Sequence, residues 1–323
     1  MSVLSGGRKS IRERVGIAAL GLCLGTVGVL LLLTVACGEG PEDEQMTFDT
    51  PDEAAEALVH AAETFDVEAL TRILGPHGVD LVVSGDPVLD QNQSEAFAAQ
   101  ARVRMQVTVD SEDPKVATLS VGAEDWPLPM PIVKKRGAWR FDTAVGREEI
   151  LYRRIGNNEL DAIEVCLGYV EAQHEYALVK HDGALVNQYA RRVISTPGKH
   201  DGLAWQDEDG SWQGPVGEGI AKIIAEGYAE RFSPFHGYYF KILEGQGPDA
   251  PFGEMSFIIG DAMIGGFAFA AAPAEYGLSG IKSFIVSHDG IVYEQDLGPT
   301  TLDQFRAMKL YNPDPSWDPV AND

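Results

Sequence analysis

The segment "ISTPGKHDGLAW" brings a serine, a histidine and an aspartate close together in the sequence. Ser195, His200 and Asp201 are the residue types of a hydrolase, in which a histidine oriented by a carboxylate takes the proton of a nucleophilic hydroxyl. His200 and Asp201 are neighbours, so neither can easily orient the other along a strand. No G-x-S-x-G elbow occurs in the sequence. We therefore favour a structured loop, with a turn at Pro197–Gly198 and Trp205 as its anchor, and expect no catalytic residue.

Two adjacent arginines come just before this loop. Arg191 and Arg192 could together clamp a carboxylate or a sulfate, because a guanidinium group matches such anions with paired hydrogen bonds. More often such cations pair with the protein's own Asp and Glu side chains. The sequence leaves both roles open.

Metal-ligand patterns are weak. Asp207–Gly210 offers carboxylate oxygens that could bind Ca²⁺, but the spacing of an EF-hand loop is missing. His174 and His181 lie seven residues apart, which is about 10 Å along a helix and too far to share one ion. Neither H-E-x-x-H nor paired cysteine ligands occur. We expect no metal site and no cofactor.

The first 36 residues have the pattern of an export signal. Four basic residues precede an apolar run from Val15 to Ala36, and the run ends within "LTVACGEG". This resembles a bacterial lipoprotein signal, in which a cysteine, here Cys37, becomes the lipidated first residue of the mature chain. The run is nearly long enough to span a bilayer, so an uncleaved N-terminal anchor is the alternative. Gly38 stands where many lipoproteins of the inner membrane have Asp, which favours the outer membrane.

The charge of the chain excludes one class of partner. Four of the 25 basic residues and one of the 49 acidic residues lie in the leader, which leaves 21 against 48 and a net charge of −27. Such a chain repels polyphosphate, so nucleic-acid binding is not expected. Beyond Cys37 the only cysteine is Cys166, so no intrachain disulfide can form there. Its apolar helical surroundings predict a buried structural thiol.

We expect two domains after an acidic linker at residues 37–45. In the first, residues 46–146, Thr50 and Pro51 begin a helix, and a second runs from Asp66 to Leu74. Alternating apolar residues then predict strands in "RVRMQVTVD", "VATLSVG" and "PIVKKRGAWRFDT". The segment "WPLPMP" could dock a partner, but an edge or inter-strand loop is favoured. Helices followed by a curved antiparallel sheet resemble the small NTF2-like or cystatin-like α+β folds.

The second domain, residues 147–323, opens with a long helix that Asn158 can cap. The spacing predicts one apolar stripe along this helix, formed by Leu160, Ile163, Leu167, Val170, His174 and Ala177. A loop is expected at residues 195–219 and a short helix at residues 220–231. Strands follow in "GYYFKIL", "FAFAAAP", "IKSFIVS" and "IVYEQDL", and Asp289–Gly290 predicts a hairpin between the last two. One face of this aromatic sheet must cover the helix, and the other is a candidate partner surface.

Two resemblances follow from these motifs. The helix with "NELDAI" and "AQHEY", and the strands with "GYYF" and "APAEYGLSGIKSFIVSHDGIV", resemble the globular head of type IV pilins and type II secretion pseudopilins. A pilin's polymerising helix runs directly into this head, whereas here a whole domain intervenes. The longer runs "DWPLPMPIVKK", "WRFDTAVGREEIL", "YVEAQHEYA" and "FHGYYFKIL" identify the mature chain as a member of a family of uncharacterised bacterial exported proteins, domain of unknown function twenty-nine-fifty.

Together these observations predict an α+β protein of the bacterial cell envelope. After a lipoprotein signal peptide at residues 1–36, a lipid on Cys37 would hold it to the membrane on the periplasmic or surface face. The sequence favours a non-catalytic binding or assembly role, with other envelope proteins as partners. One alternative is a cell-wall or peptide hydrolase acting through residues 195–210. The other is a receptor that holds a small ligand between the helices and the sheet of the first domain.

Overall fold

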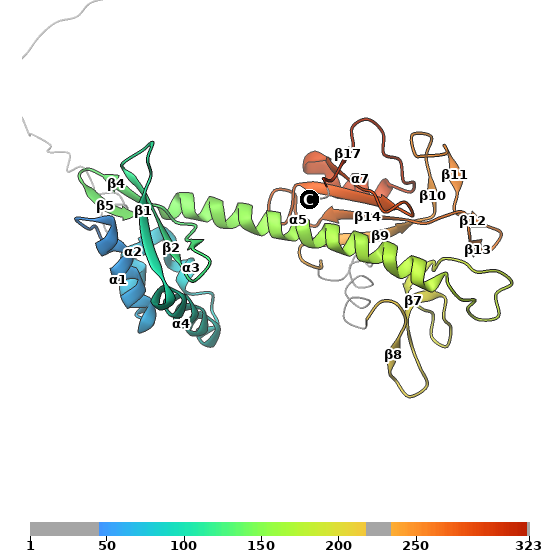
Figure 1. Cartoon of the computed structure of the whole chain (residues 1–323), viewed down its shortest axis with the longest axis horizontal. Coiled ribbons are helices and arrows are strands. Elements are labelled where there is room, and N and C mark those ends of the chain that lie inside the picture. Colours follow the sequence, from blue (N-terminus) through green and yellow to red (C-terminus); the bar gives the residue numbers. More distant parts are fainter. Residues whose placement is uncertain (1–44, 218–233, 322–323) are drawn as a thin grey trace, which may run out of the picture. The chain divides into compact units, whose positions relative to one another are not determined.

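A computed structural model describes residues 45–217 and 234–321 of the chain (Figure 1). The expected signal peptide, Cys37 and nearly all of the acidic linker lie outside these ranges. The helix expected at residues 220–231 also lies outside them. The described residues form an α+β fold with antiparallel sheets, as the sequence predicts. They hold two separate clusters of buried apolar side chains, one before and one after the start of the longest helix.

Local signals explain the helices of the N-terminal module, residues 46–141. In α1 (Pro51–Glu63) the Thr50 side chain accepts a hydrogen bond from the Glu53 amide, and Asp66 caps α2 (Val67–Leu74) in the same way. A 3₁₀ turn, η2 (Pro76–Gly78), leads into α3 (Val79–Val82). The apolar pattern of the sequence did not predict α4 (Pro87–Val103), although Asp86 caps it and Pro87 opens it. Its apolar stripe is too short to reveal it, since only Asp90, Ala98 and Ala101 are buried.

The helices α1, α2 and α4 contact a twisted antiparallel sheet. Its strands are β1 (Met105–Val109), β2 (Val116–Val121), β4 (Ile132–Lys135) and β5 (Ala138–Phe141), in that order, and the two-residue β3 (Trp126–Pro127) pairs with β2. Arg136 and Gly137 have φ of 53° and 93°, which makes the tight turn predicted between β4 and β5. Alternate residues of β2 and β5 are buried, and Leu119 and Ile132 are completely inaccessible. Side chains therefore fill the space between the helices and the sheet around Leu119 and Ile132.

The long helix begins earlier than predicted. Helix α5 runs from Thr143 to Tyr176 and is capped by Asp142, so the predicted cap Asn158 lies inside it. There the Asn158 side chain donates a hydrogen bond to the Ser279 carbonyl oxygen, at 2.8 Å. The predicted domain boundary at residues 146/147 falls in the first turn of α5. The charged segment "GREEILYRRIG" continues the helix without a break, because nothing in it stops helical hydrogen bonding.

The buried face of α5 also differs from the predicted stripe. Leu160 and Leu167 are 66% and 39% exposed, and His174 is exposed as well. Val170 is buried as predicted, together with a neighbouring row of residues: Ala162, Cys166, Tyr169, Gln173 and Tyr176. The prediction assumed that large aliphatic side chains face the core. The sheet is already rich in aromatic rings, so the helix contacts it through smaller residues and tyrosines instead.

The C-terminal module, residues 189–320, is built on a five-stranded antiparallel sheet. Its strands are β9 (Tyr238–Leu243), β14 (Ala268–Pro273), β15 (Lys282–Ser287), β16 (Val292–Asp296) and β17 (Asp318–Pro319), in the order β17-β16-β15-β14-β9. The predicted hairpin is confirmed, since β15 and β16 are paired and Gly290 has φ of 75°. On one face α5 contacts β14, β15 and β16, and the Tyr169 ring stacks on Phe269 with centroids 4.1 Å apart.

The other face of the sheet is also covered. After the 3₁₀ turn η3 (Gly298–Thr300), helix α7 (Thr301–Ala307) packs on β14. On that face β14 presents Ala268, Ala270 and Ala272, all buried, whose small side chains let the helix approach. Tyr311 and Trp317 of the C-terminal segment are buried as well. The predicted aromatic partner surface is not formed by Tyr238, Phe240, Phe269 and Phe284, because these four side chains are buried in the core.

Short paired strands complete the C-terminal module. Residues 195–219, predicted as a loop, contain β7 (Gly202–Gln206) and β8 (Trp212–Gln213), and β7 pairs in parallel with β6 (Arg192–Ile194). Two further pairs are β10 (Gly245–Gln246) with β11 (Met255–Ser256), and β12 (Ile258–Ile259) with β13 (Ala262–Met263). The two-residue strands are too short to show alternation in the sequence, and the first three residues of β7 are all buried, without the alternation that predicts a strand.

Candidate binding pocket

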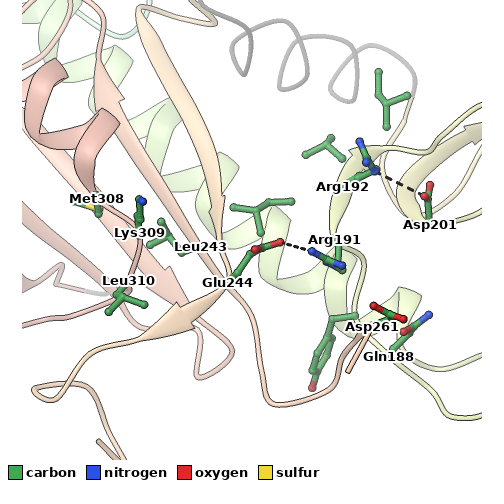
Figure 2. Close-up of a pocket in the computed structure, with 14 residues that line it drawn as sticks. Gln188, Arg191, Arg192, Asp201, Leu243, Glu244, Asp261, Met308, Lys309 and Leu310 are labelled. Carbon is green, nitrogen blue, oxygen red and sulfur yellow. Dashed lines mark hydrogen bonds and ion pairs between the residues drawn. The ribbon is translucent and has the colours of Figure 1, made fainter. Parts of the chain in front are cut away.

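An open pocket of about 880 Å³ lies in the C-terminal module (Figure 2). Its walls come from β6 and the segment before it, from Asp201 before β7, from the end of β9, from the β12–β13 turn and from the segment after α7. Charged groups of both signs line it together with apolar side chains such as Leu243 and Met308. The charged members are Arg191, Arg192, Lys309, Asp201, Glu244 and Asp261. The pocket thus contains both arginines that the sequence singled out and one of the three candidate catalytic residues.

A buried glutamine positions the two arginines. Gln173 of α5 is inaccessible to solvent, and its side-chain amide bonds both backbone groups of Ala190. Its Nε2 donates to the Ala190 carbonyl oxygen at 2.7 Å and to the Tyr169 hydroxyl at 2.8 Å, while its Oε1 accepts from the Ala190 amide at 2.8 Å. Burying an amide is favourable only when its donors and acceptors find partners. These bonds fix the backbone directly before Arg191 and Arg192.

Each arginine is close to a carboxylate of the same chain. Arg191 Nη2 lies 2.8 Å from Glu244 Oε1, and Arg192 Nε lies 3.8 Å from Asp201 Oδ2. Figure 2 shows both pairs within the pocket. Of the two roles that the sequence left open for these arginines, the contacts match pairing with the protein's own carboxylates. All four side chains are about one third exposed or more, so each pair stabilises the fold by only ~0–1 kcal/mol and can be opened by a ligand.

Lys241 holds another wall of the pocket. Its ammonium group reaches from β9 to the end of α7 and donates hydrogen bonds to the carbonyl oxygens of Phe305, Arg306 and Met308. It also lies 4.7 Å from the centre of the Phe305 ring. Burial, and secondarily the nearby Lys309, lowers the pKa of Lys241 to about 8. A cation at a helix C-terminus satisfies carbonyls that lack partners in the helix, so Lys241 fixes the segment that carries Met308 and Lys309.

The three candidate catalytic side chains make hydrogen bonds with other groups of the chain and not with one another. The Ser195 hydroxyl is buried and accepts a hydrogen bond from the Gly202 amide at 2.8 Å. Asp201 accepts from the amide and the hydroxyl of Thr196, at 2.7 and 2.8 Å. His200 instead pairs with Asp182, at 3.0 Å from Nδ1 to the carboxylate. These bonds are those of a structured loop, as the sequence favoured.

Aromatic contacts tie this loop to the end of α5. The Tyr176 hydroxyl donates to the His200 carbonyl oxygen at 2.6 Å, and burial raises the pKa of Tyr176 to about 12. The predicted anchor Trp205 lies edge-on to the rings of His181 and His200, with centroids 5.7 and 4.9 Å away. The amide of His200 bonds the Asp182 carboxylate and lowers the pKa of that group. The loop is therefore fixed by Tyr176 at the end of α5 and by residues that follow it.

The weak metal motifs form ordinary structure. Asp207–Gly210 makes the turn between β7 and β8, in which the Asp209 carboxylate accepts from the amide and hydroxyl of Ser211. The His181 ring stacks on Tyr176, and its Nε2 lies 3.0 Å from the Tyr176 carbonyl oxygen. Within residues 45–217 and 234–321, no group of three or more His, Cys, Asp or Glu side chains is arranged to hold a metal ion. The predicted buried thiol is confirmed, since Cys166 is inaccessible and burial raises its pKa well above the ordinary range.

Several residues that shape the pocket have no recognisable signal in the sequence. Gln173 was visible only as part of "AQHEY", and Lys241 as one residue of a strand. No sequence motif marks Glu244 or Lys309 as a pocket residue. Glu244 pairs with Arg191, which lies more than fifty residues away, and Lys309 lies in the segment that Lys241 of a neighbouring strand holds. A polar residue on the buried side of a helix, such as Gln173, could have been found once the buried face was known.

The fold and the pocket define a class: an α+β protein with two apolar cores, joined through one long helix, and an open pocket lined by paired charges. The chain belongs to the family described as protein of unknown function (DUF2950), which matches residues 45–320. This confirms the family that the sequence motifs identified. Comparisons with curated proteins and with solved structures found no match. In the described part of the chain, no helix has both the length and the apolar character needed to cross a bilayer.

Proposed function

We propose that this protein is a lipid-anchored component of the bacterial cell envelope that binds another envelope protein without catalysing a reaction. The observation that carries the binding role is the pocket at Arg191 and Arg192, where charges of both signs lie beside apolar side chains. Partially exposed ion pairs are weak. The charged groups of another protein segment can therefore replace one member of each pair at little cost in free energy. The apolar wall supplies the contact area that such an exchange alone would lack.

The anchor rests on the sequence. The basic and apolar leader that ends in "LTVAC" supports export and lipidation at Cys37, and Gly38 favours the outer membrane. Attachment to a membrane raises the effective concentration of a binding site for partners in the same envelope. A pocket with low affinity can therefore still be occupied there. Labelling cells with a palmitate analogue tests the anchor. The wild-type chain should incorporate it and Cys37→Ser should not, and incorporation by Cys37→Ser would refute lipidation at this residue.

We also propose finer fold assignments for the two modules. The N-terminal helices followed by an antiparallel sheet support an NTF2-like or cystatin-like type. In the C-terminal module, a long helix packed on an antiparallel meander of β14, β15 and β16 supports a likeness to the pilin head. The charged first half of α5 argues against polymerisation into a pilus. An experimental structure of either module, superposed on representatives of these folds, tests the assignment.

Site-specific cross-linking tests the binding role. A photoreactive amino acid is placed at Gln188 or at Lys309, which line different walls of the pocket, and at Glu68 on exposed α2 as the matched control. The proposal expects both pocket positions to capture the same envelope protein and the control position to miss it. Arg191→Glu together with Glu244→Ala should weaken that capture. Equal capture from all three positions, or from neither pocket position, would exclude this pocket as the binding surface.

An assay for substrate cleavage separates the hydrolase alternative from the binding proposal. The hydrolase alternative requires the Ser195 hydroxyl to leave the Gly202 amide and meet a base, whereas His200 is engaged with Asp182. Peptidoglycan and peptide substrates incubated with the purified chain should therefore remain intact. Turnover that disappears in Ser195→Ala would replace the binding proposal by the hydrolase.

A further inference from the structure

A second cavity, of about 580 Å³, lies on the N-terminal module and far from the arginine pair in sequence. Helix α4 forms one side and the hairpin between β2 and β3 the other. The residues that carry its chemistry are Phe97, Gln100, Gly122, Glu124 and Trp126. The indole of Trp126 is 60% exposed, whereas Trp139 of the same module is only 6% exposed. Tryptophan is highly buried on average, so an exposed indole that lines a cavity is a candidate ligand contact.

The exposed indole is held in a fixed position. Trp126 pairs with Val121 in the short β2–β3 ladder, which fixes its backbone. The guanidinium group of Arg153 lies 5.4 Å from the centre of the indole ring. Arg153 is itself fixed by Glu149 Oε1 at 2.7 Å and by the Pro127 carbonyl oxygen at 2.8 Å. Arg153 does not line the cavity, so it supports the ring without blocking the space beside it.

Two polar groups complete the cavity without partners of their own. Among the described residues, neither the Gln100 side-chain amide nor the Glu124 carboxylate makes a hydrogen bond or an ion pair. The Gln100 amide lies close against Gly122: a Cβ at Gly122 would lie only 2.6 Å from Gln100 Oε1, and Gly122 has φ of 81°. Glycine at this position therefore keeps the amide in place.

From this arrangement we propose that the cavity binds a neutral saccharide chain. A pyranose ring has one face of C–H bonds, whose positive edges suit the negative face of an indole. Its hydroxyl groups both donate and accept, so they can bond the amide of Gln100 and the carboxylate of Glu124.

Other ligand classes fit less well. An anion would meet the Glu124 carboxylate, while Arg104 already pairs with Asp125 at 2.7 Å and Arg153 pairs with Glu149 at 2.7 Å. A purely apolar ligand would leave the amide and the carboxylate desolvated and unpaired. This site is independent of the protein-binding pocket proposed above.

Calorimetric titration of the full chain with cellotetraose, chitotetraose and maltotetraose tests the proposal. At least one of the three should bind, with a change in tryptophan fluorescence. Trp126→Ala should weaken that binding at least about tenfold, and Trp126→Phe, which keeps a flat ring, should lose less. Gly122→Ala should also weaken it by displacing the Gln100 amide. Phe252→Ala removes an aromatic ring that is 92% exposed elsewhere and serves as the control, with unchanged affinity expected.

Two results would overturn the proposal. The first is that none of the three saccharides binds at concentrations up to about 10 mM, the weak end of specific recognition. The second is binding that Trp126→Ala leaves unchanged. Failure of the cross-linking experiment at Gln188 and Lys309 would not bear on this site, since those residues do not line this cavity.

Discussion

Gln173 offers the sharpest test of how the arginine pocket is positioned. Its side chain is completely buried and makes three hydrogen bonds, two with the backbone of Ala190 and one with the Tyr169 hydroxyl. We consider Gln173→Leu, which keeps the size of the side chain and removes both polar ends. The Ala190 amide and carbonyl would then be buried without partners.

The expected change in the free energy of unfolding follows from the unpaired amide and carbonyl of Ala190. A buried backbone group without a partner costs ~1–3 kcal/mol, so the two groups of Ala190 together cost ~2–6 kcal/mol. Leucine recovers roughly 1–2 kcal/mol by burying more apolar surface. We expect a net loss of about 3 kcal/mol in the free energy of unfolding of the C-terminal module. That is a large fraction of the ~5–15 kcal/mol that stabilise an ordinary domain.

Two measurements check this prediction. Urea unfolding gives the change in stability, and hydrogen exchange read by mass spectrometry shows whether residues 188–194 lose protection. Gln91→Leu is the control, because Gln91 lies on exposed α4 and bonds only the exposed Glu95 in the same helix. Its change should stay within about 0.5 kcal/mol. If Gln173→Leu were as stable as the control and residues 188–194 stayed protected, the positioning role of Gln173 would be wrong.

Three further predictions concern the sheet, the pH dependence and the thiol. Gly280→Ala places a Cβ 2.1 Å from the hydroxyl oxygen of the buried Tyr238, so we expect a loss of ~1–3 kcal/mol by urea unfolding. Gly168→Ala on α5, where a Cβ meets nothing within 4 Å, should instead gain up to ~1 kcal/mol. The pKa of Lys241 falls from 10.5 to about 8 on folding, so the unfolded chain binds more protons in this range. The stability of the wild type relative to Lys241→Met should therefore rise as the pH increases from about 8 to 10.5, and a flat difference would contradict the burial of this amine. Cys166 should resist alkylation in the native chain and react only after unfolding, and rapid labelling at neutral pH would show that the thiol is accessible.

Signals within a few residues of each other predicted the local structure well. Thr50 with Pro51, Asp66, and Asp289 with Gly290 set helix starts and a hairpin through contacts between near neighbours, and the structure confirms each. The alternating apolar residues of β2 and β5 face the core for the same reason. Helix α4 escaped because its buried face is short, although its cap at Asp86 was visible.

Contacts between residues far apart in the sequence decided where α5 begins and which of its faces is buried. Asn158 looks like a cap in isolation, but α5 runs through it because its backbone continues to bond and Ser279 gives the side chain a partner. The stripe through Leu160 and Leu167 is apolar, yet the sheet selected the face with Cys166 and Tyr169. Which of two apolar faces is buried depends on the shape of the surface it meets, and that surface comes from strands about a hundred residues away.

The sequence by itself determined the family, the α+β class and the buried state of Cys166, and it predicts a leader at residues 1–36 ahead of Cys37. These depend on composition, on motifs and on neighbours within a turn or two. Only the tertiary structure decided that Arg191 and Arg192 meet Glu244 and Asp201, and that Ser195 bonds a backbone amide. A side chain's role in a site depends on the partner that the fold places within about 3 Å, and spacing along the chain does not encode that distance.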